Sequence, residues 1–271
     1  MKAKFYVNNK EYEINTPEGI DISIPMLFNR EQPNIYDVDK ASAKAFKSEQ
    51  FTGDTRLGGS CNFEEYKLIP HCNGTHTECV GHISDERISI HTTLRDSLIP
   101  STLISAVPID AFNTTDNYSP HKREGDIMIT VKALKDALGD INKDFIKGLI
   151  IRTLPNDDSK KSRRYSQNHP PYFSIEAMEL ITELGIEHLL VDIPSVDRAF
   201  DKGRLTNHHI YWNVKQGSHE VDRLKHSLKT ITEMIYAPND VEDGFYLLNL
   251  QIAPFAADAA PSRPVIYSVT S

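Results

Sequence analysis

Apolar and polar positions alternate along several stretches of the chain, and this alternation predicts strands. Two alternating arms at residues 4–14, "KFYVNNKEYEI", meet at Asn8-Asn9, which is typical of a β-hairpin covering residues 1–16. Further strands are predicted at "GDIMIT" (125–130), "KGLIIRTL" (147–154), "HLLVDI" (188–193), "TITEMIY" (230–236) and "GFYLLNLQIAPF" (244–255). The most apolar of these runs have the composition of strands that are buried on both faces.

Two stretches have helical spacing instead. Four apolar residues recur at helical intervals from Ile175 to Leu184 and stop at Gly185, so a helix is predicted after Ser174. Thr130 can cap a shorter helix, "VKALKDAL", which Gly139 closes. Strands and helices thus alternate, and no linker-like change of composition divides the chain. We expect a single α/β domain over residues 1–271, built on a mixed sheet flanked by helices.

Composition narrows the possible partners. With 271 residues, of which 39% are hydrophobic, the chain can bury a large core. A formal charge of −8 argues against binding along a nucleic-acid backbone. The basic run "KKSRR" at 160–164 lies in a polar stretch and is interpreted as a solvated loop. We therefore expect no nucleic-acid partner.

The N-terminal residues contain no apolar run of signal-peptide length, and no later stretch approaches the roughly 20 apolar residues of a membrane span. These features predict a cytoplasmic protein without a membrane partner. The three cysteines, Cys61, Cys72 and Cys79, are too few and too odd in number for a disulfide framework, so reduced thiols are expected.

Candidate chemistry is concentrated in "HCNGTHTECVGH", residues 71–82, which holds three histidines, two cysteines and a glutamate. If residues 76–82 are extended, His76, Glu78, Val80 and His82 share one face, while Cys79 lies on the other. The turn signal Asn73-Gly74 could fold His71 back toward His76. Imidazole and carboxylate ligands together suit zinc or manganese, and a small set of them leaves positions open for water.

Two other interpretations of this stretch remain open. It could be a polar surface loop, although its density of ligand-type residues favours a metal. It could also hold a structural zinc ion bound by Cys72, Cys79 and histidines, which requires a closed set of four ligands. Cys79 would point away from His76 and Glu78 in an extended segment, which counts against the structural site.

The same run resembles the H-x-G-T-H-x-D-x-P-x-H motif of the putative cyclase family, metal-dependent hydrolases that include bacterial kynurenine formamidase and isatin hydrolase. Other segments resemble the family in the same order, from about Asp21 to Val265. They are "GGSCN" (58–62), "DIPSVD" (192–197), "LTNHH" (205–209), "TITEMI" (230–235) and "DAAPSRPV" (258–265). The resemblance implies the family's swivelling β/α fold, in which the sheet forms a barrel-like core.

The resemblance also implies roles for individual residues. His71, His76 and Glu78 fall where the family has its first metal ligands, and Glu78 stands at the aspartate that can bridge two metals. His208 and Glu233 fall at the second metal's ligands. The position of the family's catalytic histidine is occupied by His82. The implied cofactor is one or two divalent ions, with zinc favoured over manganese.

The motif departs from the family pattern at three positions. Glu78 is one methylene longer than aspartate, and Val80 replaces a proline. Asn73 lengthens the first interval by one residue, so either His71 or Cys72 could be the first ligand.

The late segments leave further alternatives open. His209 adjoins His208 and could replace it as a ligand, although the register favours His208. Glu233 could be an exposed edge residue on spacing alone. The segment 210–232 is longer than in the formamidase, and Tyr211 and Trp212 in it could shape a substrate pocket or simply pack.

The reaction implied by the resemblance is hydrolysis of an amide-type C–N bond in a small molecule, either an N-formyl aromatic amine or a cyclic amide. A divalent metal lowers the pKa of a bound water and polarises the carbonyl, while His82 moves the proton to the leaving nitrogen. The alternative is an inactive or binding-only relative in which the metal is structural. Similar proteins form dimers and tetramers, so a homodimer or homotetramer is expected.

Overall fold

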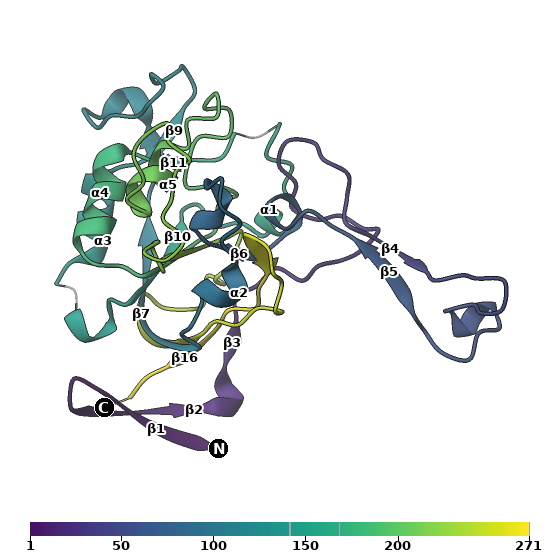
Figure 1. The fold of residues 1–271 in the computed structure, drawn as a ribbon. Coiled ribbons are helices and arrows are strands. Elements are labelled where there is room, and N and C mark those ends of the chain that lie inside the picture. Colours follow the sequence, from purple (N-terminus) through teal and green to yellow (C-terminus); the bar gives the residue numbers. More distant parts are fainter. Residues whose placement is uncertain (141, 168, 271) are drawn as a thin grey trace.

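A curled, mixed sheet of nine strands forms the centre of the molecule in the computed structural model, which describes residues 1–140, 142–167 and 169–270 (Figure 1). From edge to edge the strand order is β15-β6-β13-β12-β10-β7-β14-β16-β3. The strands are β3 (Ile20–Asp21), β6 (His76–Glu78), β7 (Leu98–Ala106), β10 (Gly148–Thr153), β12 (His188–Val191), β13 (Thr230–Glu233), β14 (Gly244–Asn249), β15 (Ala259–Pro261) and β16 (Val265–Ser268). The four central strands, from β13 to β7, are parallel, and the outer ones are antiparallel. The predicted α/β class, mixed sheet and barrel-like core are confirmed.

The central strands are buried on both faces because their apolar side chains supply two cores. Leu149 and Ile151 of β10 point into the larger core, while Ile150 between them points into the second one. The larger core also receives the apolar faces of three helices, which lie together on one face of the sheet (Figure 1). The helices of the chain are α1 (Pro70–Asn73), α2 (Ile90–Thr93), α3 (Val131–Leu138), α4 (Ile175–Glu183) and α5 (Thr206–Tyr211), of which α3, α4 and α5 form this layer.

The local signals in the sequence act as predicted. The Thr130 hydroxyl accepts a hydrogen bond from the backbone N–H of Ala133 at the start of α3, and Ser174 caps α4 through Ala177 in the same way. The N-terminal hairpin pairs β1 (Lys2–Val7) with β2 (Lys10–Asn15). Its two turn asparagines have left-handed φ angles of 47° and 66°, as a tight hairpin turn requires.

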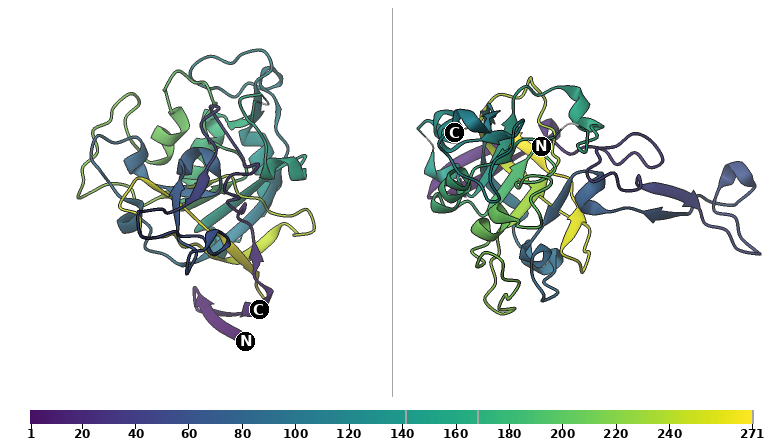
Figure 2. Two further views of the ribbon diagram at one scale, coloured as in Figure 1. Left: turned by 90° about the vertical axis from the view of Figure 1, so that its right-hand side faces the viewer. Right: turned by 90° about the horizontal axis from the view of Figure 1, so that it is seen from above.

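Two smaller sheets complete the fold. Strands β8 (Ile109–Asp110), β9 (Ile127–Ile129) and β11 (Tyr172–Phe173) form one of them. Strands β4 (Ser42–Ala45) and β5 (Glu64–Lys67) form an antiparallel hairpin that extends away from the rest of the molecule (Figure 2). Within the described ranges, no helix combines the length and the apolar character needed to cross a bilayer.

Two interpretations need correction. The long central strand β7 was not predicted, because Pro100 and its hydroxyl residues interrupt the apolar pattern that marks a buried strand. The basic run at 160–164 is not simply a solvated loop either. Lys160 is buried, and its ammonium group donates to Asp192 over 2.7 Å and to the Thr153 carbonyl over 2.6 Å. The pair of buried charges is satisfied by this network.

Candidate metal centre

Five predicted ligands converge at one end of the sheet, although they come from four separate elements. His71 lies on α1, His76 and Glu78 on β6, His208 on α5 and Glu233 at the end of β13. The antiparallel pairing of β6 with β13 places Glu233 directly opposite His76, so their side chains share a face. The fold thus brings together residues that are up to 162 positions apart in the chain.

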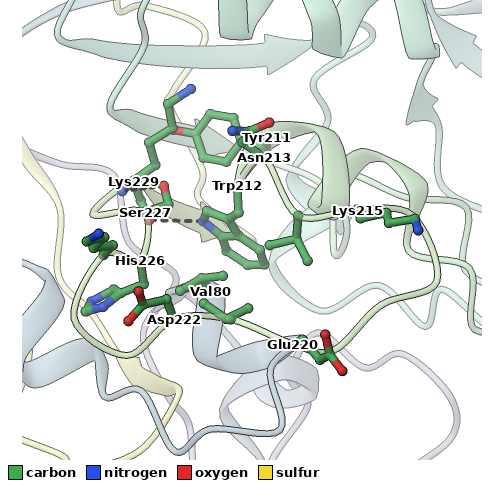
Figure 3. A pocket seen from close by; sticks show the side chains of 13 residues that line it. Val80, Tyr211, Trp212, Asn213, Lys215, Glu220, Asp222, His226, Ser227 and Lys229 are labelled. Carbon is green, nitrogen blue, oxygen red and sulfur yellow. Dashed lines mark hydrogen bonds between the residues drawn. The ribbon is translucent and has the colours of Figure 1, made fainter.

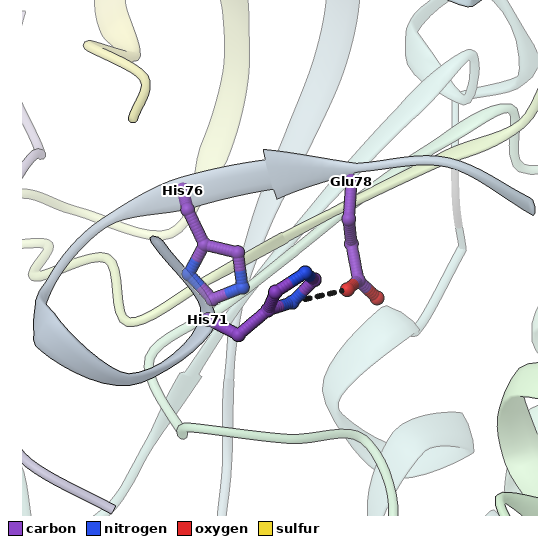
Figure 4. Close-up of side chains that lie close together, drawn as sticks. All are labelled: His71, His76 and Glu78. Carbon is purple, nitrogen blue, oxygen red and sulfur yellow. Dashed lines mark ion pairs between the residues drawn. The ribbon is translucent and has the colours of Figure 1, made fainter. Parts of the chain in front are cut away.

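Glu78 lies at the middle of this group. Its Oε2 is 3.0 Å from His71 Nδ1, and its Oε1 is 3.0 Å from His208 Nε2. Figure 4 marks the pair with His71 by a dashed line. The Nε2 atom of His76 lies 3.5 Å from Glu233 Oε2. The Glu233 Oε1 atom accepts a hydrogen bond from the backbone N–H of Val196. Glu78 therefore connects the ligands of the motif to the late histidine.

Asp258 is a further member of the group, and the sequence interpretation did not single it out. Its Oδ2 lies 2.9 Å from His71 Nε2 and 3.4 Å from His82 Nδ1. The residue immediately precedes β15, which pairs with β6. Asp258 is the first residue of "DAAPSRPV", the C-terminal run on which the family resemblance rests, and this was the signal that could have identified it.

Asp197, the last residue of "DIPSVD", orients His208. Its Oδ2 atom is 2.6 Å from His208 Nδ1. Its two oxygens also accept the backbone N–H groups of Asn207 and His208 in the first turn of α5. This arrangement directs the opposite ring nitrogen, Nε2, toward Glu78. A carboxylate behind a histidine is the usual way in which proteins fix the ring of a metal ligand.

Acidic side chains in the cluster outnumber fixed positive charges. Four carboxylates converge, those of Glu78, Asp197, Glu233 and Asp258, and the first three are almost completely buried. Among the described residues no lysine or arginine forms an ion pair with any of them. Buried carboxylates require either protonation or a positive partner.

The carboxylates raise the pKa of two of the histidines. Burial alone lowers the pKa of His71, but Asp258 and Glu78 outweigh it and raise this pKa to about 10. Burial also lowers the pKa of His208, but its interactions with Asp197 and Glu78 outweigh burial. The pKa of His208 therefore lies well above its usual value. Interactions with His71 and His82 hold the pKa of Asp258 far below its usual range. The cluster therefore attracts positive charge.

The donor atoms fit a divalent metal. His76 Nε2 and Glu78 Oε2 are buried and make no hydrogen bond to the described residues, so both atoms are available to bind a metal. Three overlapping groups have ligand atoms within 4.8 Å of one another: His71, His76 and Glu78; Glu78, His82 and His208; and His71, His82 and Asp258. Mixed imidazole and carboxylate donors suit zinc or manganese. Glu78 belongs to two of the groups, as a bridging ligand would.

The expected extended conformation of residues 76–82 is wrong beyond Glu78. Strand β6 ends there, and Val80–His82 form a 3-10 turn. Val80 is fully buried in the larger core and does not share the face of the ligands. His82 nevertheless reaches the cluster from this turn, and its Nδ1 lies 3.9 Å from Glu78 Oε2.

The structure shows where the alternative first ligands and the two nearby cysteines lie. His71 lies in the cluster, whereas Cys72 packs in a small apolar cluster with Ile35, Tyr165 and Ala199. Cys79 is buried, and its thiol lies 3.6 Å from the Ile88 carbonyl oxygen. The position of both thiols therefore disfavours a structural cysteine–zinc site.

The structure also distinguishes between the alternatives for the later ligands, His208 and Glu233. His208 lies in the cluster, while the ring of the neighbouring His209 lies 6.4 Å from that of His219, measured between centroids. Glu233 is not an exposed edge residue, because β13 lies between β6 and β12 and its carboxylate is buried.

Tyr211 and Trp212 are both buried, and the Trp212 ring lies 5.3 Å from the His208 ring between centroids. A cavity of about 400 Å³ lies beside Trp212, bounded by the long segment that follows α5 (Figure 3). None of the candidate ligands lines this cavity. Trp212 therefore lines the cavity and also lies beside the His208 ring.

Both the sequence and the fold are similar to those of known proteins. The sequence model of the Cyclase family, described as "Putative cyclase", matches residues 20–198, about two thirds of the chain. The chain belongs to the cyclase family. No curated protein matches the sequence.

Solved structures with the same fold include isatin hydrolase A from Labrenzia aggregata bound to benzyl benzoate, with 12% identity and a TM-score of 0.59. That match covers 92% of this chain and 93% of the other. A predicted metal-dependent hydrolase from Bacillus stearothermophilus has 14% identity and a TM-score of 0.57, and covers 92% and 98% of the two chains. Both show that the cyclase fold extends over nearly the whole chain.

Proposed function

We propose that this cyclase-family protein is a metal-dependent hydrolase that cleaves an amide-type C–N bond in a small molecule. The observation that carries the proposal is the cluster of histidines and carboxylates, whose charge no lysine or arginine of the described residues balances. Similar folds in isatin hydrolases support a C–N bond as the target. The substrate class is an N-formyl aromatic amine or a cyclic amide.

The ligands would be His71, His76, Glu78, His208 and Glu233, which hold one or two divalent ions, with zinc the best fit and manganese the second. When bound, the metal supplies Lewis acidity, which polarises the substrate carbonyl and makes water a nucleophile near neutral pH. Asp197 and Asp258 keep the histidine rings in place by accepting hydrogen bonds from them.

His82 would move the proton. Its side chain is 27% exposed, whereas His76 and His208 are buried, so a substrate can approach its ring. Asp258 lies 3.4 Å from His82 Nδ1 and holds one edge of the ring, which leaves the other nitrogen for the reacting groups. From there His82 can accept a proton during attack and return it to the leaving nitrogen.

Replacing His82 tests this proposal. His82→Ala should retain its metal and its fold, because the five ligands remain, while hydrolysis of N-formyl aromatic amines or cyclic amides such as isatin falls by about 10²- to 10⁴-fold. The matched control is His91→Ala, an exposed histidine on α2, which should behave as the wild type. Metal content is measured by elemental analysis and hydrolysis by absorbance.

Two results would contradict the assignment. Loss of metal together with activity in His82→Ala would make His82 a ligand. A wild-type protein that binds metal but hydrolyses nothing on the panel would instead favour a binding-only relative with a structural metal.

A further inference from the structure

A cavity of about 500 Å³ lies beside residues 199–205, which lead into α5, and none of the candidate metal ligands lines it. Its walls include Tyr36, Phe200, Lys202 and Leu205. A cavity of this volume accommodates a small organic molecule, and such sites combine apolar walls with a few polar groups. The side chains in its walls therefore indicate the chemistry of the molecule that it binds.

The wall formed by Tyr36 connects this cavity to the candidate metal centre. The preceding residue, Ile35, packs in an apolar cluster with Cys72, which follows the candidate ligand His71. Burial raises the pKa of the Tyr36 hydroxyl, and the negative charge of Glu233 raises it further, because the two side chains lie near each other. Tyr36 thus lies between the cavity and two candidate ligands.

Two aromatic side chains form an exposed pair in the cavity. The Tyr36 side chain is 48% exposed and Phe200 is 47% exposed, and their ring centroids lie 5.6 Å apart at an interplanar angle of 82°. Large apolar side chains that are exposed next to each other mark binding sites. Aromatic rings pack edge-to-face or offset against other rings, so this pair suits an aromatic group.

The backbone around the cavity is strained. Three of the lining residues, Tyr36, Lys202 and Leu205, have left-handed φ angles of 63°, 64° and 46°. Residues other than glycine adopt this conformation uncommonly, and strain of this kind is concentrated at ligand-binding sites. The conformation of the walls therefore supports a binding role for this cavity.

The charged groups in the cavity favour an anion. Arg123 and Lys202 both line it, both are exposed, and neither forms an ion pair with a described residue. The acidic residue in the lining, Asp201, is buried, and its oxygens accept the backbone N–H groups of Gly203 and Leu205. A guanidinium binds a carboxylate through two parallel hydrogen bonds. The cavity therefore offers two free cations to a carboxylate.

We propose that the substrate carries a carboxylate on its aromatic ring, and that Arg123 and Lys202 bind this carboxylate while Tyr36 and Phe200 pack against the ring. The amide-type bond of the same molecule then faces the metal centre. This inference rests on the proposed function and narrows its substrates to acidic ones. In the reaction, water adds to the formyl carbon, the C–N bond breaks and the nitrogen takes a proton. The products are formate and an aromatic amine that keeps its carboxylate.

Two substrates that differ only in the carboxylate test the proposal, 4-formamidobenzoate and its neutral analogue formanilide. The wild type should have a kcat/KM at least about 10-fold higher for 4-formamidobenzoate. Arg123→Gln should lower this kcat/KM by about 10- to 100-fold, mainly through KM, and leave that of formanilide unchanged, because only the acidic substrate loses a charged hydrogen bond. Arg204→Gln is the matched control, since Arg204 is exposed in the same segment but does not line the cavity.

Phe200→Ala separates the ring contact from the charge. It should raise KM by about 10-fold for both substrates, because both lose the same aromatic contact. Since Phe200 is half exposed, the variant should remain folded, which circular dichroism checks. An unchanged KM for both substrates would show that the ring binds elsewhere and would overturn the proposal.

Binding of the product 4-aminobenzoate, measured by calorimetry on the zinc-loaded protein, does not require turnover. The wild type should bind it at least about 10-fold more tightly than Arg123→Gln. Equal affinities would assign the carboxylate to the metal centre and overturn the inference, and so would equal kcat/KM values for the two substrates in the wild type. If neither substrate is hydrolysed, the proposed function fails instead, and the calorimetry still decides whether Arg123 binds the anion.

Discussion

Glu78 joins more of the candidate centre than any other side chain described. One of its oxygens faces His208, and the other faces His71 and His82. The family motif has aspartate here, and the extra methylene of glutamate lets the carboxylate extend further from the short strand β6. A buried carboxylate needs a positive partner, which here is either a protonated histidine or a bound cation.

Glu78→Gln keeps the shape of this side chain and removes its charge. We expect metal affinity to fall by at least about 100-fold, since even partners behind the ligands contribute 10- to 100-fold. Glu183→Gln, an exposed residue at the end of α4, is the control and should bind metal as the wild type does. Titration with zinc in the presence of a competing chelator measures both. Equal affinity in the two variants would show that Glu78 is not a ligand.

Individual residues were predicted from the sequence to different extents. The motif and the family resemblance pointed to His71, His76, Glu78, His208 and Glu233, because residue type and order are readable along the chain. The resemblance left His71 and Cys72 as alternatives for the first ligand. Asp258 was missed, because its contact with His71 exists only after β15 has paired with β6.

Among the elements, the turn after β6 decides where His82 lies. Gly81 sits in this turn, and a Cβ atom there would be 2.0 Å from the carbonyl oxygen of Ile88 and 3.3 Å from Asp258 Cβ. Any larger residue must move the turn away from Ile88. The His82 side chain, which leaves the chain at the next position, must then move as well.

Gly81→Ala should therefore reduce hydrolysis by about 10-fold or more while the metal remains bound, because misplacing a catalytic group by about 1 Å can cost 100-fold. Gly74→Ala is the matched control in the same segment. Its Cβ would meet only the flexible end of Met26, at 3.2 Å. Steady-state kinetics and metal analysis of both variants test this expectation. A wild-type rate of hydrolysis in Gly81→Ala would show that the reaction does not depend on the position of His82.

The same turn shows why the elements were predicted incompletely. Alternation in the sequence continues through His82, so period-two spacing extends the strand too far. The close approach of Ile88 to Gly81 involves a residue outside the alternating stretch, so period-two spacing does not reveal the turn. Helices α3 and α4 were predicted well, since their caps and apolar spacing are local. Strand β7 was missed because its burial between β10 and β14 offsets a composition with poor strand signals.

At the scale of the whole molecule, the sheet assembles one centre from distant parts of the chain. β6 and β15 lie at one edge, next to β13, and α5 presents His208 from the helical layer. The class of fold followed from the alternation of strands and helices, whereas the strand order depends on long-range pairing that no single segment encodes. The candidate ligands come together only when the strands pair in this order.

The proposed function depends on a divalent metal in this centre, and the metal content of protein purified without chelator tests this most directly. Because four carboxylates meet there without lysine or arginine partners in the described chain, we expect one to two equivalents of zinc or manganese per chain by elemental analysis. Removing the metal should also lower the melting temperature, because a ligand that binds only the folded state stabilises it. Substoichiometric metal, with no rise in melting temperature on adding either ion, would show that the centre does not bind a divalent metal.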